Sequence, residues 1–131
     1  SFKKEGKPLK IFGDGSQRRD FTYVKDIAKA NLLAASSVKV GSGECINIGT
    51  GTNSSIQEVA NIFGGPFEYL PKRLEPSQSL ADNTKAKELL GWEPKMSREQ
   101  GMKITFEYFK GLTKQELFKS EHKDFSKHIR S

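Results

Sequence analysis

The chain has 131 residues, a net charge of +6 and one cysteine, Cys45. Its 34% hydrophobic and 29% charged residues are typical of a globular domain and argue against an intrinsically disordered chain. A lone cysteine excludes an intrachain disulfide and a cysteine-rich metal site, so we expect a reducing compartment, the cytoplasm.

Two further classes of protein are disfavoured by the pattern of charge and hydrophobicity. No apolar run approaches the ~20 residues of a membrane helix, and the first eight residues lack the apolar core of a signal peptide. The 22 basic residues are spread along the chain without a basic stripe, so we interpret them as solvated surface. Only the net charge would favour a nucleic-acid-binding domain. We therefore expect neither a nucleic-acid nor a membrane partner.

The first quarter of the chain predicts two short strands and a helix. Leu9–Phe12 is apolar, suits a strand and ends at a glycine turn. Residues 21–24 form a second β-prone run. Small and apolar residues at helical spacing then predict a helix over Val24–Ser36, with Asp26 in its first turn.

The middle of the chain contains the most convincing buried strand. Residues 44–48 end at a Gly-Thr-Gly turn, and we expect Ile46–Ile48 to be buried on both faces. A capping box of Ser55 and Glu58 predicts a helix over Ile56–Phe63. A strand over Phe67–Leu70 follows.

Helices dominate the remainder of the predicted elements. Thr84–Leu90 is expected to end at Gly91, and Ser97 is expected to cap a helix over residues 99–110. We expect Trp92 and Phe106 to lie in the core. Residues 112–131 predict a highly charged helical tail.

Alternating strands and helices indicate an α/β protein. However, only one strand, 44–48, has the composition of a strand that is buried on both faces, and one such strand does not make a complete parallel sheet. We therefore expect a partial fold whose unpaired faces favour self-association, and hence a homo-oligomer.

The segment 13–26 carries the residues best suited to bind an anion. Arg18 and Arg19 follow the glycine turn directly, and a guanidinium fork matches the oxygens of a phosphate group. The segment therefore predicts a binding site for a phosphate-bearing ligand.

The chain resembles the C-terminal, substrate-binding part of extended short-chain dehydrogenases/reductases, because four groups of its residues follow the order found in that family. Within them it is most similar to the NAD-dependent nucleotide-sugar epimerases and dehydratases, UDP-sugar 4-epimerases above all. The matching residues are Pro8 to Gly15; Gln17, Arg19 to Phe21, Tyr23, Val24 and Asp26; Ile46 to Gly51, Ser55 and Glu58; and Arg73, Ala81, Asp82, Lys85, Ala86, Leu89 to Trp92 and Pro94.

This resemblance implies a partial Rossmann-like fold and a set of substrate-binding residues. It implies that the segment containing Leu9, Lys10 and Phe12 lies against the nucleotide base. It further implies that Arg19 and Arg73 hold the diphosphate and that Asn47 adds a polar contact nearby.

Each of these assignments has a structural alternative. Arg19 could pair with Asp20 or Asp26 on the surface, and Arg73 could be a solvated loop residue. Asn47 could be purely structural. The sequence after Arg73 also departs from the family, because Leu-Glu-Pro stands where members carry a glycine and an acid.

The catalytic half of such an enzyme is not visible in the sequence. No G-x-G-x-x-G fingerprint and no Y-x-x-x-K pair occurs, so we expect no catalytic, cofactor-binding or metal-binding residue. The resemblance implies NAD in the complete enzyme, and we expect none to be held by this chain alone.

The sequence therefore predicts the UDP-sugar-binding portion of an epimerase or dehydratase over residues 1–111, inactive by itself, followed by the tail at 112–131. The alternative is a non-catalytic binding or assembly module that uses the tail.

Overall fold

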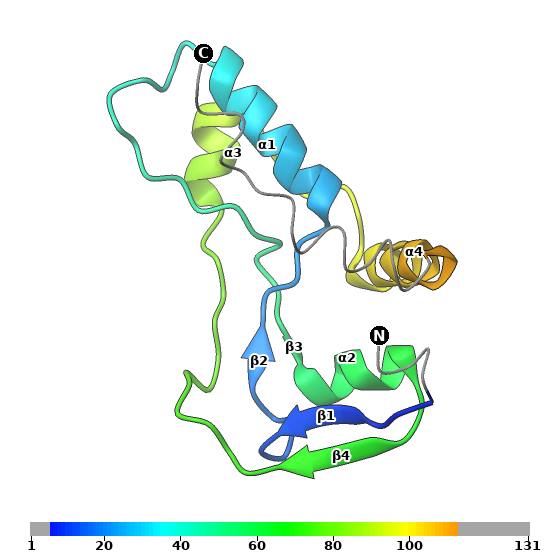
Figure 1. Ribbon diagram of the computed structural model, residues 1–131. Helices are drawn as coiled ribbons and strands as arrows, with labels where there is room; N and C mark the ends of the chain where they lie inside the picture. The colour runs from blue at the N-terminus through cyan, green and yellow to red at the C-terminus, as the bar shows by residue number, and fades with distance from the viewer. Residues whose placement is uncertain (1–5, 113–131) are drawn as a thin grey trace, which may run out of the picture.

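The computed structural model describes residues 6–112. The elements in chain order are β1 (Leu9–Phe12), β2 (Arg18–Arg19), α1 (Val24–Ser36), β3 (Ser54–Ser55), α2 (Ile56–Phe63), β4 (Phe67–Leu70), α3 (Thr84–Leu90) and α4 (Arg98–Gly111). Two groups of elements lie at opposite ends of the molecule and are joined by extended segments (Figure 1).

The first group, which we call the β-unit, consists of β1, β4 and α2. The two strands are parallel, with Leu9 opposite Phe67 and Phe12 opposite Leu70. Helix α2 covers one face of the strand pair (Figure 1). Ile11 is buried at this interface, which gives the β-unit its largest buried side chain.

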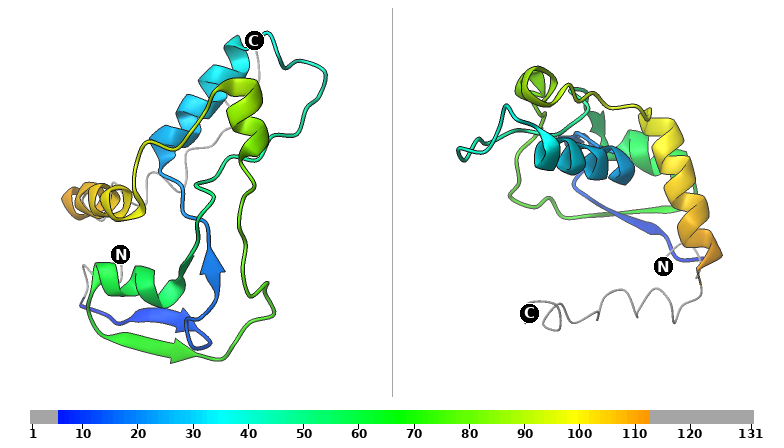
Figure 2. Two further views of the ribbon diagram at one scale, coloured as in Figure 1. Left: turned by 180° about the vertical axis from the view of Figure 1, so that it is seen from behind. Right: turned by 90° about the horizontal axis from the view of Figure 1, so that it is seen from above.

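The second group, which we call the helical unit, consists of α1, α3 and Trp92. The two helices lie side by side in both side views (Figures 1 and 2). Ala30, Ala86, Leu90 and Trp92 form its buried core. The indole N–H of Trp92 also donates to the backbone oxygen of Asp26 at 2.9 Å, which satisfies the one polar atom of this buried ring.

The two units are connected by a short ladder and by the last described helix. Strands β2 and β3 pair antiparallel, with Arg18 opposite Ser55. Helix α4 runs away from the helical unit (Figure 2) and packs on α2, where the rings of Phe63 and Phe106 are 5.7 Å apart. The prediction of Phe106 as a core residue is therefore only partly right, because its side chain is half-buried, whereas Trp92 is fully buried.

The predicted helix ends are confirmed. Ser55 and Glu58 form a reciprocal capping box at the start of α2. Gly91 ends α3 in the left-handed conformation, with φ 62°. The hydroxyl of Ser97 accepts from the backbone N–H of Gln100, and α4 is one residue longer at each end than predicted.

The predicted strand at residues 21–24 is wrong. The strand lies earlier, at Arg18–Arg19, and Val24 is already the first residue of α1. A β-prone composition forms a strand only where a partner is in register. The partner, Ser54–Ser55, lies opposite the two arginines rather than the aromatic run.

The predicted buried strand at residues 44–48 is also wrong. The segment is extended, but it pairs with no other strand within the described part of the chain. Ile46 and Ile48 are half-buried against the helical unit, whereas Cys45 and Asn47 are exposed. The segment is therefore buried on one face only.

Almost all of the tail predicted at 112–131 lies outside the described residues. Helix α4 ends at Gly111, where the predicted substrate-binding portion also ends. Within residues 6–112, no helix has the length and apolar character needed to cross a membrane.

Candidate functional site

The residues predicted to bind a nucleotide base lie on β1. Ladder hydrogen bonds to β4 fix the backbone of this strand, and Gly13 N extends the ladder to Leu70 O at 2.8 Å. Leu9 and Phe12 are half-buried and Lys10 is exposed. The strand therefore presents a rigid backbone edge and a partly open aromatic ring.

Arg73 lies directly over this aromatic ring. Its guanidinium carbon is 3.3 Å from the centroid of the Phe12 ring, which is a close cation–π contact. Arg73 itself belongs to the loop that follows β4 and is exposed. The contact brings together two residues that the sequence assigned separately to the base and to the diphosphate.

Arg19 reaches the same loop from β2. Its Nη2 lies 2.5 Å from Oε2 of Glu75, and its Nη1 donates to the backbone oxygen of Arg18 at 2.8 Å. The alternative in which Arg19 pairs with Asp20 or Asp26 is wrong, because its acidic partner is Glu75. Glu75 lies two residues after Arg73, so Arg19 contacts the same loop that carries Arg73.

Backbone hydrogen bonds hold the loop beside β2. The N–H of Arg18 donates to Ser77 O at 2.9 Å, and the N–H of Ser79 donates to Arg18 O at 3.0 Å. These bonds form an isolated parallel bridge between Arg18 and Gln78. Every residue from 71 to 80 is nevertheless exposed, so the site is open to solvent.

Asn47 is not brought to this site. It lies in the extended segment 44–48 that packs on the helical unit, its side chain is exposed, and no contact joins it to Arg19 or Arg73. Its predicted role as a phosphate ligand has no support in the geometry.

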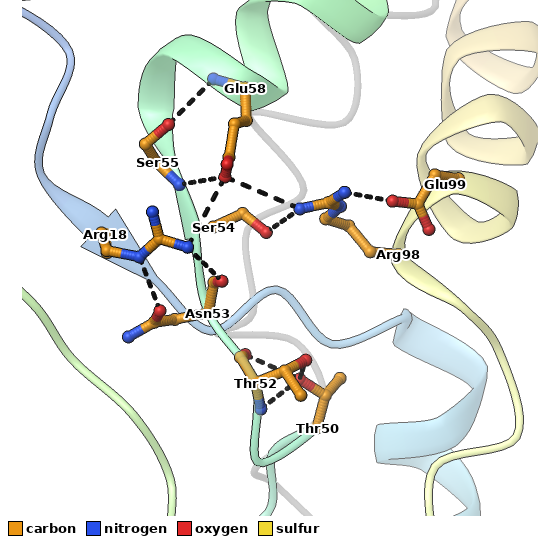
Figure 3. A network of polar contacts seen from close by, with 9 residues as sticks. All are labelled: Arg18, Thr50, Thr52, Asn53, Ser54, Ser55, Glu58, Arg98 and Glu99. Carbon is orange, nitrogen blue, oxygen red and sulfur yellow. Dashed lines mark hydrogen bonds and ion pairs between the residues drawn. The ribbon is translucent and has the colours of Figure 1, made fainter.

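Arg18 belongs to a different cluster of polar residues. Its Nε and Nη2 donate to Asn53, to the side-chain oxygen at 2.8 Å and the backbone oxygen at 2.9 Å. Its Nη2 also lies 3.7 Å from Glu58. Arg98 approaches the same carboxylate from α4, at 3.8 Å, and also contacts Ser54 and Glu99 (Figure 3).

This cluster ties α4 to β3 and α2. Hydrogen bonding by the backbone N–H of Ser55, together with the charges of Arg18 and Arg98, holds the pKa of Glu58 below its ordinary value of 4.5. Sequence reasoning did not single out Arg98, because nothing local connects residue 98 with residues 54 and 58. The cluster leaves Arg18 directed away from the site that Arg19 faces.

Two aspartates of the segment 13–26 support the backbone. Asp20 accepts from the backbone N–H and the hydroxyl of Thr50, at 2.9 and 2.7 Å, and from the N–H of Gly51 at 3.1 Å. Asp26 is buried and accepts from the N–H groups of Lys95 and Met96, at 3.1 and 3.0 Å. Asp20 and Asp26 therefore fasten two turns that are distant in the sequence.

An apolar cavity of about 800 Å³ lies between the start of α1, α2 and α4, and Arg98 but neither Arg19 nor Arg73 is among its lining residues. Tyr23, Phe63, Met102 and Phe109 are among its lining residues. Within residues 6–112, no group of three or more metal-ligating side chains comes together.

Comparisons with known proteins find a family match in the region that contains β1, β2 and α1. Residues 2–49 match the NAD dependent epimerase/dehydratase family. The chain is 42% identical over 114 residues to a UDP-glucuronate 4-epimerase of Thermodesulfobacterium geofontis, a match that covers 81% of this chain and 34% of the relative. It is 38% identical over 112 residues to a UDP-glucose 4-epimerase of Mycolicibacterium smegmatis, covering 80% of this chain and 35% of the relative.

Solved structures show the same likeness. The UDP-glucuronic acid 4-epimerase from Bacillus cereus, in complex with UDP-glucuronic acid and NAD, superimposes with a TM-score of 0.79 at 35% identity. The match covers 86% of this chain and 38% of that structure. The chain belongs to the NAD-dependent epimerase/dehydratase family. The predicted family and the predicted partial Rossmann-like α/β fold are both confirmed.

The chain spans about a third of the length of these relatives. A UDP-glucose 4-epimerase from Thermotoga maritima, solved with UDP-glucose, is 43% identical with a TM-score of 0.68, and the match covers 81% of this chain and 36% of that one. These relatives were thus solved with UDP-sugars, and the matched residues correspond to one part of their length.

Proposed function

We propose that this chain is the UDP-sugar-binding portion of an NAD-dependent epimerase or dehydratase. The observation that carries the proposal is that Arg19 contacts, through Glu75, the same exposed loop whose Arg73 stacks on Phe12 at the end of β1. A diphosphate needs cationic groups from more than one direction, and here one arginine comes from β2 and the other from the loop after β4.

Arg19 already holds a carboxylate in this structure. Its Nη2 meets Glu75 at 2.5 Å, so the geometry of the guanidinium suits an oxyanion. Phosphate oxygens present the same acceptor arrangement with more negative charge. The base would lie against β1 beside Leu9, Lys10 and Phe12, where the backbone is fixed by the ladder to β4.

We further propose that this chain by itself does not hold NAD. A bound dinucleotide usually rests its pyrophosphate on a helix that begins at a glycine-rich turn after a strand. The four described helices begin after Tyr23, Ser55, Asn83 and Ser97, and none begins at a glycine. We therefore propose that NAD, and the residues that move protons and hydride, belong to the rest of the complete enzyme, and that this portion by itself is inactive.

Calorimetric titration of the intact protein with UDP and UDP-sugars tests the anchoring role. A charge-assisted hydrogen bond contributes about 1.5–3 kcal/mol, so Arg19→Ala is expected to weaken binding by roughly ten- to a hundredfold. The matched control is Arg18→Ala, which removes the neighbouring guanidinium that faces Asn53 and Glu58. Equal affinity of Arg19→Ala and the unaltered protein, with the fold preserved, would contradict the proposal.

The assembly function of the tail stays a separate prediction. It concerns residues 112–131, and no contact of the described residues favours it over substrate binding.

A further inference from the structure

The loop after β4 carries a carboxylate into the proposed diphosphate site. Oε2 of Glu75 lies 2.5 Å from Nη2 of Arg19, and the two side chains are 34% and 24% exposed. Glu75 is the one acid paired with Arg19 among residues 6–112. The group that would grip a phosphate is therefore neutralised by a residue of the same chain.

Contacts on both sides of Glu75 explain how it reaches this position. On one side, Arg73 is held over the ring of Phe12. On the other, Ser77 and Ser79 are bonded to the backbone of Arg18. Glu75 lies in the short stretch between these two anchors and points at Arg19, while the surrounding loop remains exposed.

A carboxylate and a phosphate group compete for the same guanidinium edge. Both present oxygen acceptors to the N–H groups of the fork. The other Arg19 nitrogen with a partner, Nη1, is occupied by the backbone oxygen of Arg18. A phosphate oxygen that approaches Nη2 therefore meets the carboxylate of Glu75 already in contact with this nitrogen.

The ion pair between Arg19 and Glu75 is weak enough for a ligand to replace it. Ion pairs at partly exposed positions are weak, because solvent screens the attraction and ordering two side chains costs entropy. A diphosphate brings more charge than one carboxylate and is gripped by Arg73 as well. Displacement of Glu75 by the ligand is consequently favourable, at the cost of some affinity.

We propose that Glu75 is an internal competitor that occupies Arg19 in the unliganded protein and is displaced when the diphosphate of a nucleotide sugar binds. This inference rests on the proposed function, because it assigns a regulator to the same site. Glu75 thereby sets the threshold of ligand concentration at which the site fills.

The test is calorimetric titration of the intact protein with UDP. Removing a competitor raises the fraction of binding-competent sites, so Glu75→Gln is expected to lower the Kd by about two- to fivefold. Glu88→Gln is the matched control, because it removes the same charge from an exposed position on α3. Its Kd is expected to equal that of the unaltered protein.

Glu75→Asp separates direct competition from a general charge effect. The aspartate keeps the negative charge but withdraws the carboxylate by one methylene group from Arg19, so UDP is expected to bind more tightly here too. An unchanged or raised Kd in Glu75→Gln would overturn the inference, since Glu75 would then only position Arg19. Tighter binding in Glu75→Gln with Glu75→Asp unaltered would overturn it as well, because net charge alone would be responsible.

The same titration distinguishes this inference from the function on which it rests. If the unaltered, folded protein binds no UDP, the proposed function fails. If the unaltered protein binds UDP and the Glu75 variants bind no more tightly, only the role of Glu75 as a competitor fails.

Discussion

The helical unit and the β-unit are stabilised in different ways. The helical unit surrounds one large buried side chain, Trp92, which is 2% exposed and donates to the backbone of Asp26. The β-unit has a backbone ladder between β1 and β4 and a capped helix, with Ile11 as its largest buried side chain.

This difference indicates where single substitutions cost most. A buried indole concentrates apolar contact area and one buried hydrogen bond in a single residue. A ladder distributes its stabilisation over backbone groups that no side-chain substitution removes. We therefore expect the largest loss in the free energy of unfolding from one substitution in the helical unit. A smaller loss is expected between the units, and the smallest in the β-unit.

The largest effect is expected for Trp92→Ala. Deleting a buried aromatic side chain leaves a cavity and costs about 3–5 kcal/mol in the free energy of unfolding. Urea unfolding followed by circular dichroism measures the change. Val38→Ala is the matched control, because Val38 is 99% exposed in the loop after α1 and its truncation is expected to cost at most about 0.5 kcal/mol. A similar loss in the free energy of unfolding in both variants would contradict a dominant contribution of Trp92 to stability.

An intermediate effect is expected for Gly49→Ala, which tests the connection between the units. A Cβ at position 49 would lie 2.3 Å from Cβ of Ala81 and 2.7 Å from Oδ2 of Asp20. Overpacking of this kind costs about 1–3 kcal/mol, because the backbone or its neighbours must shift. The same urea titration measures the loss.

Gly111→Ala serves as the control for Gly49→Ala. Among the described residues beyond its chain neighbours and the backbone of α4, no atom lies within 4 Å of a Cβ built at Gly111, which is the last residue of α4. Alanine is expected to leave the free energy of unfolding unchanged or slightly higher there. A stability of Gly49→Ala equal to that of the unaltered chain would show that the two units do not depend on the turn at 49–51.

The smallest effect is expected in the β-unit, at the cap of α2. Ser55→Ala removes the hydroxyl that accepts from the N–H of Glu58 at 3.0 Å, and the loss of such a cap costs about 1 kcal/mol. The substitution Glu58→Gln removes the charge from the same cap, and the stability of this variant as a function of pH tests the role of that charge.

The sign of this pH dependence follows from the lowered pKa of Glu58. A hydrogen bond from the backbone N–H of Ser55 favours the charged carboxylate in the folded chain, so its contribution is present above the ordinary pKa of 4.5. That contribution is lost as the pH falls through the lower pKa of the folded state. Glu58→Gln is thus expected to destabilise the chain at neutral pH and to flatten the acid limb of the stability curve. An acid limb identical to that of the unaltered chain would contradict this role.

The sequence predicted much of the local structure because the deciding contacts are short-range. Ser55 and Glu58 marked the start of α2, and Gly91 marked the end of α3, since each signal involves a side chain or a backbone conformation within one helical turn. For the site, the structure pairs Arg19 with Glu75 and places Arg73 over Phe12, whereas Asn47 lies in the segment that packs on the helical unit. The binding roles of these residues stay predictions.

The sequence by itself determined the helix boundaries, the strands β1 and β4 and the family, because each depends on local chemistry or on residue order. Only the tertiary structure decided that residues 44–48 pair with no strand among the described residues, that Arg19 meets Glu75, and that Asp26 fastens the chain at Lys95 and Met96. The reason is physical: a ladder, an ion pair and a buried carboxylate each require a partner from a distant part of the chain, and the folded packing selects that partner.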